Sequence, residues 1–160
     1  MLMQNTIAAL LFLFPMLMGA ACDQNTPAPS GGDQDSIAEN TETMSDTLLI
    51  KIGDKEFTAT LVDNPTAAAF RALLPLTINM TELNGNEKYF RLSKSLPTNE
   101  SNPGTIQSGD LMLYGSNTFV LFYESFSTSY SYTKLGKISS TAGLVSALGK
   151  GNVTVSISLR

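Results

Sequence analysis

The C-terminal segment at residues 153–159, VTVSISL, carries the clearest structural signal in the chain. Apolar residues alternate with polar ones there, and this period of two is expected of a β-strand that buries one face. Alternation also occurs at residues 48–52 and 56–61, on either side of a turn at 53–55, which predicts a β-hairpin. Because residues 47–160 begin and end with strong strands, we expect a sheet that closes into a barrel.

Two short helices are predicted within this region. Asn64 suits the N-cap of the first helix, since its side-chain oxygen can accept a free helical N–H, and Pro65 suits the first helical position. Pro75 is expected to stop this helix, because proline cannot donate to the helical ladder. The second helix follows Ser140, and Gly149 is expected at its end. The residues expected on the apolar faces are Ala67, Phe70, Leu73 and Leu74 in the first helix and Leu144, Val145 and Leu148 in the second.

Five further strands are expected between the helices, at residues 76–80, 88–92, 111–114, 118–123 and 134–138. Residues 93–109 are mostly polar and contain prolines and glycines, which predicts a long surface loop. The pattern favours a mainly β fold, a closed eight-stranded β-barrel capped by two α-helices. Side chains fill the interior of a barrel of this size, so a binding site is expected on the outer wall or beneath a loop.

The N-terminus has the features of an export signal. Residues 1–21 carry no charged side chain, and the apolar run at 7–20 is shorter than the roughly 20 residues that cross a bilayer. Small residues then precede Cys22, and this arrangement resembles a bacterial lipoprotein signal. The resemblance implies that Cys22, the one cysteine in the chain, becomes a lipid anchor. The alternative is a chance cysteine near an ordinary cleavage site.

Charge separates the linker from the folded part. Residues 23–46 hold six acidic side chains and no basic one, whereas residues 47–160 hold ten basic and eight acidic side chains. We expect residues 22–46 to comprise the lipidated cysteine and a disordered acidic linker, because so polar a stretch cannot bury enough surface to order itself. The barrel domain at 47–160 is nearly neutral, so no nucleic-acid partner is predicted. The expected location is the bacterial cell envelope, on the extracytoplasmic side.

The absence of two residue types excludes several enzyme classes. The 160 residues contain no histidine and no tryptophan. A Ser-His-Asp triad, a zinc site of the HExxH type and imidazole acid–base catalysis are therefore impossible. With one cysteine, an internal disulfide and a Cys-x-x-Cys metal site are excluded as well. We predict no metal site and no cofactor.

Several segments of the barrel domain share the pattern of one family. They are LVDNPTA at 61–67 leading into LLPL at 73–76, then GNEKYF at 85–90, GDL at 109–111, FY at 122–123 and YSYTKLGKI at 130–138. Together they resemble the bacterial cyclophilin-like domain family. The resemblance implies an eight-stranded barrel with two capping helices. Many members are small exported or lipid-anchored proteins of unassigned activity.

The resemblance also suggests a reaction. Cyclophilins isomerise Xaa-Pro bonds with an arginine that donates to the prolyl amide, in a shallow cleft that also holds phenylalanines, a glutamine, a tryptophan and a histidine. The tryptophan and the histidine are absent here. If the protein is an isomerase, the resemblance implies that Arg91 is the catalytic residue that donates to the prolyl amide. The alternative is that Arg91 is an outward-facing strand residue in a surface ion pair.

Other side chains suggest either a ligand-binding surface or packing between strands. An aromatic cluster amid serines and threonines could form a ligand platform or could pack strands together; its members are Tyr123, Phe126, Tyr130 and Tyr132. Glu87 and Asp110 lie where strands are expected to begin, and carboxylates there commonly accept backbone N–H bonds in turns.

Three functions follow from these observations. The first is a non-catalytic domain that binds a peptide segment or small ligand on the outer barrel wall. The second is a weak peptidyl-prolyl isomerase acting on exported proteins, and the third is a structural envelope protein. The residues expected at the binding site are Phe90, Arg91, Phe122, Tyr123 and Tyr130.

Overall fold

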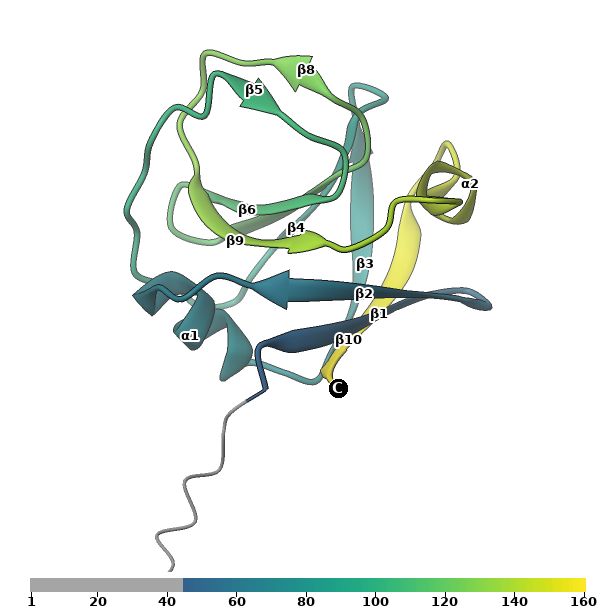
Figure 1. Ribbon diagram of the computed structural model, residues 1–160, viewed down its shortest axis with the longest axis horizontal. Coiled ribbons are helices and arrows are strands. Elements are labelled where there is room, and N and C mark those ends of the chain that lie inside the picture. The colour runs from purple at the N-terminus through teal and green to yellow at the C-terminus, as the bar shows by residue number, and fades with distance from the viewer. Residues whose placement is uncertain (1–44) are drawn as a thin grey trace, which may run out of the picture. The chain divides into compact units, whose positions relative to one another are not determined.

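A computed structural model describes residues 45–160 of the protein. The predicted signal peptide, Cys22 and most of the acidic linker lie outside these residues. Figure 1 shows the elements, which are β1 (Thr47–Ile52), β2 (Lys55–Leu61), α1 (Pro65–Arg71), β3 (Leu76–Leu83), β4 (Glu87–Arg91), β5 (Thr105–Ile106), β6 (Asp110–Tyr114), β7 (Thr118–Phe122), β8 (Phe126–Ser127), β9 (Thr133–Ile138), α2 (Leu144–Leu148) and β10 (Val153–Leu159).

Eight of the strands close into an antiparallel barrel, as the alternation at both ends of the domain predicts. The order around the barrel is β1-β10-β3-β4-β7-β6-β9-β2. The first and last strands lie side by side, with Ile50 opposite Ile157, and β1 also pairs with β2. The expected order of eight strands and two helices is therefore confirmed.

The barrel interior is a packed hydrophobic core. The alternating apolar residues of β1, β2 and β10 point into it, among them Leu48, Ile50 and Val155, which have no exposed surface. Helix α1 covers one end, where Phe70 stacks on Phe119 of β7 with ring centroids 4.9 Å apart. Filling of this kind leaves the outside of the wall as the place for a ligand site.

The start of α1 follows the prediction closely. The Asn64 side chain accepts a hydrogen bond from the backbone N–H of Ala67 at 2.7 Å, and Pro65 occupies the first turn. Pro75 was expected to stop the helix, but the helix already ends at Arg71. The chain turns there, because the N–H groups of Leu73 and Leu74 donate to carbonyls three residues earlier. Leu73 and Leu74 are half-buried beyond the helix instead of lying on its face.

Helix α2 departs from the prediction on one face. Leu144 and Leu148 are buried, but Val145 is half exposed, so the expected apolar face of three residues is reduced to two. The positive φ of Gly149 ends the helix, as expected of a glycine at that position.

The segment expected to be a long loop contains a short strand. β5 pairs with β8 to form a separate two-stranded sheet, with Ile106 opposite Phe126. Figure 1 shows this sheet set apart from the barrel strands, with α1 at the other side of the view. Beneath it lies a second apolar cluster, whose buried members are Ile106, Met112, Val120, Phe122 and Tyr132. Strands β6 and β7 are thus covered on both faces.

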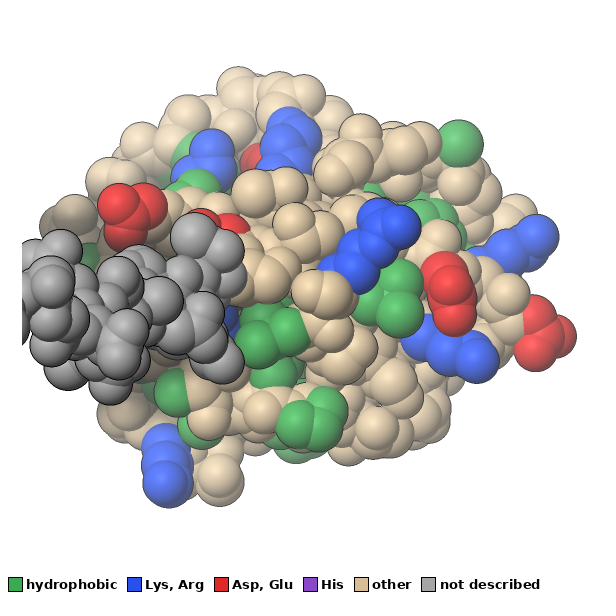
Figure 2. All heavy atoms as spheres, turned by 60° about the horizontal axis from the view of Figure 1, so that its bottom comes forward, with side chains coloured by type: hydrophobic (Ala, Val, Ile, Leu, Met, Phe, Trp, Pro, Cys, Tyr) green, Lys and Arg blue, Asp and Glu red, His purple; other side chains and the backbone are tan. Residues whose placement is uncertain are grey.

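Charge is mixed on the face of the protein shown in Figure 2. Acidic and basic side chains are interspersed there among polar atoms, and apolar side chains form small separate groups. Within residues 45–160, neither helix has the length and apolar character that a membrane-spanning helix requires.

Candidate functional site

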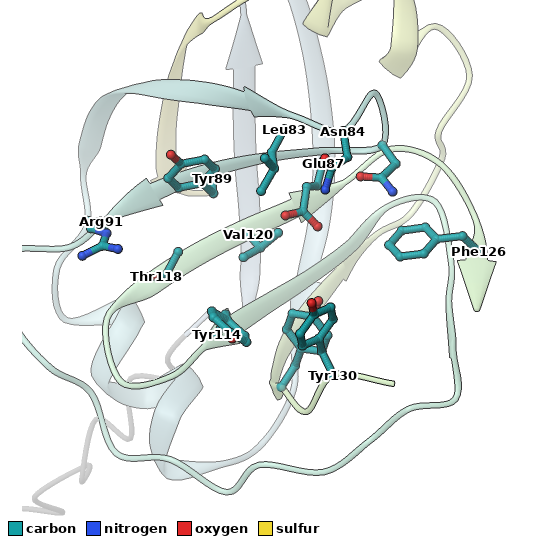
Figure 3. Close-up of a pocket in the computed structure, with 12 residues that line it drawn as sticks. Leu83, Asn84, Glu87, Tyr89, Arg91, Tyr114, Thr118, Val120, Phe126 and Tyr130 are labelled. Carbon is teal, nitrogen blue, oxygen red and sulfur yellow. The ribbon is translucent and has the colours of Figure 1, made fainter. Parts of the chain in front are cut away.

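A cavity of about 410 Å³ lies on the outside of the barrel wall; we call it the outer-wall cavity. Its wall is formed by outward-facing residues of β4, β6 and β7, together with the β3–β4 turn. Phe126 of β8 and the segment that follows β8 complete the lining. In Figure 3, Arg91 and Phe126 lie at opposite ends of the cavity, with Glu87, Val120 and Tyr130 between them.

Aromatic rings dominate the cavity. Tyr89, Tyr114, Tyr130 and Tyr132 all line it, as does Phe126. The rings of Tyr114 and Tyr130 meet edge to face, with centroids 6.1 Å apart and planes at 88°, and Tyr114 and Tyr132 are tilted by 51° at 5.6 Å. These rings contact one another edge to face or at a tilt, so they do not form a flat slot.

Two of these tyrosines are unusually exposed. Tyr130 retains 62% of its accessible surface and Tyr114 retains 47%, although their neighbour Tyr132 is buried. Within residues 45–160, five large apolar side chains are exposed, and three of them, Leu83, Tyr114 and Tyr130, line this one cavity. Exposed apolar surface that gathers in one place marks an interaction site more often than scattered residues do.

Glu87 and Arg91 are the charged residues in the lining. The Glu87 carboxylate is directed into the cavity, toward the side on which Tyr130 lies (Figure 3). Burial raises the pKa of Glu87 to about 7, and the negative charge of Glu82 adds to the rise. A carboxyl group with its pKa near neutrality, in a concave aromatic site, is typical of a functional position.

The five residues expected at the binding site are not brought together. Arg91 and Tyr130 line the outer-wall cavity. Phe122 is buried beneath it, where its ring lies 5.7 Å from Phe126. Phe90 packs against the core inside the barrel, and Tyr123 also belongs to that core. Successive residues of a strand point to opposite faces, so Phe90 cannot share a face with Arg91, nor Tyr123 with Phe122.

The expected aromatic cluster is divided in the same way. Phe126, Tyr130 and Tyr132 gather around the outer-wall cavity, joined by Tyr114, whereas Tyr123 lies on the inner side. Packing accounts for part of the cluster, because Tyr132 packs against Phe122, whereas Tyr130 remains exposed.

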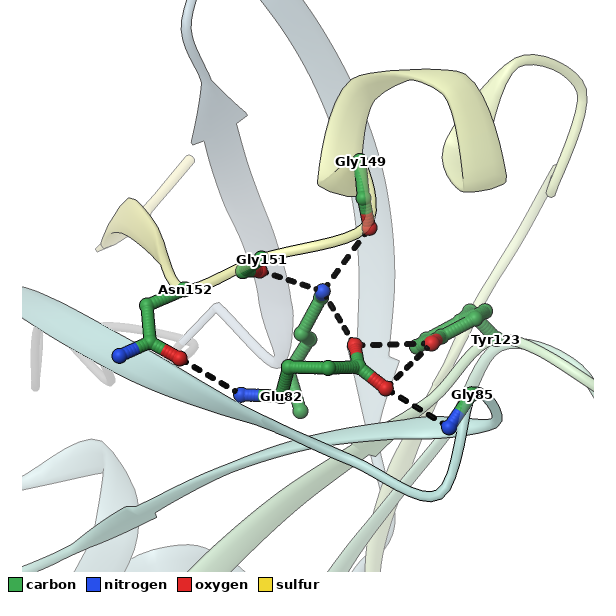
Figure 4. A network of polar contacts seen from close by, with 7 residues as sticks. Glu82, Gly85, Tyr123, Gly149, Gly151 and Asn152 are labelled. Atoms are coloured by element: carbon green, nitrogen blue, oxygen red, sulfur yellow. Dashed lines mark hydrogen bonds and ion pairs between the residues drawn. The ribbon is translucent and has the colours of Figure 1, made fainter.

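The inner side holds a polar network that the sequence did not predict; we call it the barrel-end network. Lys88 has no exposed surface, and its ammonium group donates to a Glu82 carboxylate oxygen and to the carbonyls of Gly149 and Gly151, the latter two at 2.9 and 2.7 Å. The Tyr123 hydroxyl donates to Glu82 at 2.8 Å. Figure 4 shows these contacts converging at the end of α2.

The network shifts the pKa values of two of its members, Glu82 and Tyr123. Burial alone would raise the pKa of Glu82, but hydrogen bonds from Lys88, Tyr123 and the Gly85 N–H lower it below its usual value. Burial and donation to Glu82 raise the pKa of Tyr123 to about 12. Lys88 is fully enclosed, and its hydrogen bonds link β3, β4 and the end of α2. The network is therefore a structural clamp.

Other carboxylates have ordinary structural roles. Asp110 accepts a hydrogen bond from the backbone N–H of Gln107 at 2.8 Å, as expected of a carboxylate in a turn, and pairs with Lys137. In the part of the chain that the structure describes, no three acidic or cysteine side chains are grouped as a metal site would require.

The cavity residues that sequence reasoning missed include Glu87, Tyr89 and Tyr114. All three lie on the outward face of their strands. The sequence spacing could have revealed two of them, because alternate residues of a strand lie on the same face. Glu87 and Tyr89 precede Arg91 by four and two positions and so share its face. The Asn84-Gly85 pair, in which both residues have positive φ, also marked the tight turn that starts β4.

Comparison with known proteins places this chain in a family. A model of the Cyclophilin-like family matches residues 50–158, more than half of the chain and nearly all of its barrel domain. The chain therefore belongs to the cyclophilin-like family, as the resemblance of its segments implied.

A solved structure shares this fold. The solution structure of a hypothetical protein from Archaeoglobus fulgidus superposes with a TM-score of 0.52 at 18% identity, covering 72% of this chain and 95% of that one. At so low an identity the likeness concerns the fold. The comparison with curated proteins found no match.

Proposed function

We propose that this protein is a non-catalytic binding domain of the bacterial cell envelope, lipid-anchored on the extracytoplasmic side. It holds a peptide segment or a small ligand against the outer wall of its barrel. The observation that carries the proposal is the outer-wall cavity, whose volume of about 410 Å³ lies within the range of ligand pockets.

The lining of the cavity suits binding. Ligand pockets combine apolar and aromatic walls with a few polar groups that orient the ligand. Here the walls are mainly aromatic, and the charged groups are Glu87 near the middle and Arg91 at one end. Tyrosine offers a large rigid surface at a small cost in side-chain entropy, which makes it effective in recognition.

Prolyl isomerisation is a second candidate because Arg91 lines the same cavity. The reaction needs a donor to the prolyl amide and no nucleophile, and an exposed guanidinium beside aromatic rings could supply one. The lack of tryptophan and histidine leaves the rest of the cyclophilin site without equivalents. Binding without catalysis therefore has the stronger support.

A panel of Xaa-Pro tetrapeptides and small amines, acids and neutral aromatics tests both candidates. We expect at least one class to raise the melting temperature of the purified protein. Tyr130→Ala and Arg91→Ala should each weaken that binding at least about tenfold. Lys51→Ala, which changes an exposed lysine of β1 outside the cavity, should leave it unchanged.

Each outcome separates the candidates. Accelerated isomerisation of the tetrapeptides that is lost in Arg91→Ala would establish the enzyme. Binding without acceleration would establish the binding domain. If Tyr130→Ala and Arg91→Ala bind the same ligands as the parent protein, the cavity is not the site. If no class binds, a structural role in the envelope becomes the better account.

The anchoring part of the proposal rests on the sequence around Cys22. The intact protein should fractionate with membranes, and mass spectrometry should find a lipid on Cys22. Cys22→Ser should be released to the soluble fraction. An unmodified cysteine, or a variant that stays on the membrane, would contradict the anchor.

A further inference from the structure

The acidic side chain in the outer-wall cavity has no cation beside it. Within residues 45–160, the ion pairs join Arg71 to Asp46, Lys88 to Glu82 and Lys137 to Asp110, and none involves Glu87. The basic residue of the lining is Arg91, four positions further along β4, which places the two Cα atoms about 13 Å apart. The Glu87 carboxylate is thus available to a positive group from outside the protein.

A second acceptor lies next to it in the lining. The side-chain oxygen of Asn86 is buried and accepts no hydrogen bond from residues 45–160. A buried polar atom without a partner is costly, so such atoms call for an explanation. Asn86 also lines the cavity, next to Glu87, so the space that a ligand would occupy adjoins a residue whose polar group is unsatisfied.

The aromatic walls favour the same kind of ligand. The faces of tyrosine rings are negative and attract cations within about 6 Å of the ring centre. Tyr114 is inclined to both Tyr130 and Tyr132, at 88° and 51°. Rings held at these angles offer no single flat surface on which a planar group would stack. The Glu87 carboxylate is directed toward the Tyr130 side of the cavity (Figure 3).

We propose that the outer-wall cavity binds a primary ammonium group, with the Glu87 carboxylate as its counter-ion and the rings of Tyr114, Tyr130 and Tyr132 as its walls. The group could belong to a small free amine or to a lysine side chain of a peptide. This inference rests on the proposed function, since it names the charge of the ligand that the cavity holds.

The test compares pairs of molecules of which one carries an ammonium group and the other is neutral. Isothermal titration calorimetry of the purified protein would use 2-phenylethylamine against 2-phenylethanol. It would also use a blocked Ala-Lys-Ala peptide against its Nε-acetylated form. We expect the charged member of at least one pair to bind at least about tenfold more tightly. The pair that shows the preference distinguishes a free amine from a lysine side chain.

Matched variants locate the effect. Glu87→Gln keeps the size and shape of the side chain, so it should fold normally and lose the preference for the charged member. Glu56→Gln changes an exposed glutamate of β2 and should retain it. Tyr130→Ala should weaken binding of the ammonium, whereas Tyr130→Phe, which keeps the ring face, should retain most of it.

The pH dependence gives an independent readout. Ammonium affinity should fall as the pH drops below the pKa of Glu87, toward the affinity of the neutral member of the pair, because protonation removes the counter-ion. Other titratable groups surround Glu87, namely Glu82, Tyr89 and Arg91 from β3 and β4, and Tyr114, Tyr123, Tyr130 and Tyr132 from β6 and the segment after β7. The Glu87→Gln variant separates the contribution of Glu87 from theirs, and its affinity should not show this decrease.

The experiments distinguish a failure of the ammonium inference from a failure of the proposed function. Equal binding of charged and neutral members, lost in Tyr130→Ala, would overturn the ammonium inference and support the cavity as a ligand site. A preference that survives Glu87→Gln, or that also disappears in Glu56→Gln, would overturn the role of Glu87. Absence of binding by both pairs would overturn the inference, while the wider ligand panel would still decide the proposed function.

Discussion

At the scale of single residues, two glutamates five positions apart have opposite environments. Glu82 points inward and receives hydrogen bonds from Lys88, Tyr123 and the Gly85 N–H, which hold its pKa below the usual value. Glu87 points outward into an aromatic cavity, and burial raises its pKa to about 7. One carboxylate thus joins elements of the protein, and the other faces the cavity that we propose as the ligand site.

Removing the charge of Lys88 should destabilise the barrel strongly. Lys88→Met keeps an apolar stem but leaves Glu82 and the carbonyls of Gly149 and Gly151 without their donor. Breaking a buried pair on one side costs about 3–5 kcal/mol of unfolding free energy, which urea denaturation would measure.

Lys137→Met is the matched control for this change. Lys137 also lies on a strand and pairs with a carboxylate, Asp110, but its side chain is half exposed. Asp110 is buried but keeps its hydrogen bond from the Gln107 N–H, and a half-exposed lysine contributes about 1 kcal/mol, so this variant should lose much less stability than Lys88→Met. Similar losses in both variants would show that the barrel-end network is not a clamp.

The raised pKa of Glu87 predicts a pH-dependent cost in stability. The folded protein holds the Glu87 proton more tightly than the unfolded chain does, so stability falls as pH rises from about 4.5 to about 7 and stays reduced above. Glu87→Gln removes this cost. After allowance for solvent screening, the variant should gain about 1 kcal/mol over the parent above about pH 7.5.

The gain should vanish where the carboxyl is protonated in both states, below about pH 4.5. Thermal unfolding of both proteins across this range measures the difference. A constant difference at every pH would show that Glu87 titrates as it does in the unfolded chain.

At the scale of elements, the alternation of apolar and polar residues predicted the strands that bury one face. The strands β1, β2 and β10 have one face in the core and one in solvent. Their sequences therefore alternate clearly between apolar and polar residues. The helix start at Asn64-Pro65 was also readable, because a cap is a local contact. β5 and β8 were missed since strands of two residues show no period, and they form only through pairing across distant parts of the chain.

Closure of the barrel depends on Gly136 in β9, where the chain passes close to β2. A Cβ added there would lie 2.4 Å from the carbonyl oxygen of Thr60. Gly136 pairs with Leu61 on one side and Leu111 on the other, so neither neighbour can move without disturbing the sheet. Gly136→Ala should reduce the unfolding free energy by about 1–3 kcal/mol in urea denaturation.

Gly151→Ala provides the comparison, because a Cβ there meets nothing within 4 Å. Its unfolding free energy should stay within about 0.5 kcal/mol of the parent value. If the two alanine variants were equally stable, the approach of β9 to β2 would be looser than the structure shows.

At the scale of the whole molecule, one sheet wall separates two cores. Phe119 and Leu121 of β7 face the barrel interior, whereas Val120 and Phe122 face the cluster beneath β5 and β8. The expectation of a site on the outer wall followed from the filled barrel. Its residues were only partly predictable, because the cavity depends on how segments after β7 fold back over the wall.

The central claim is that ligands bind in the outer-wall cavity, and 3-fluorotyrosine offers its most direct test. The chain has five tyrosines, of which four line the cavity, whereas Tyr123 lies inside the barrel and serves as an internal control. Titration of the fluorinated protein with 2-phenylethylamine, and with the strongest binder of the ligand panel, would be followed by ¹⁹F NMR. We predict shifts in the resonances of Tyr89, Tyr114, Tyr130 and Tyr132 while that of Tyr123 stays in place. Binding that moves Tyr123 alone, or none of the five, would contradict the account.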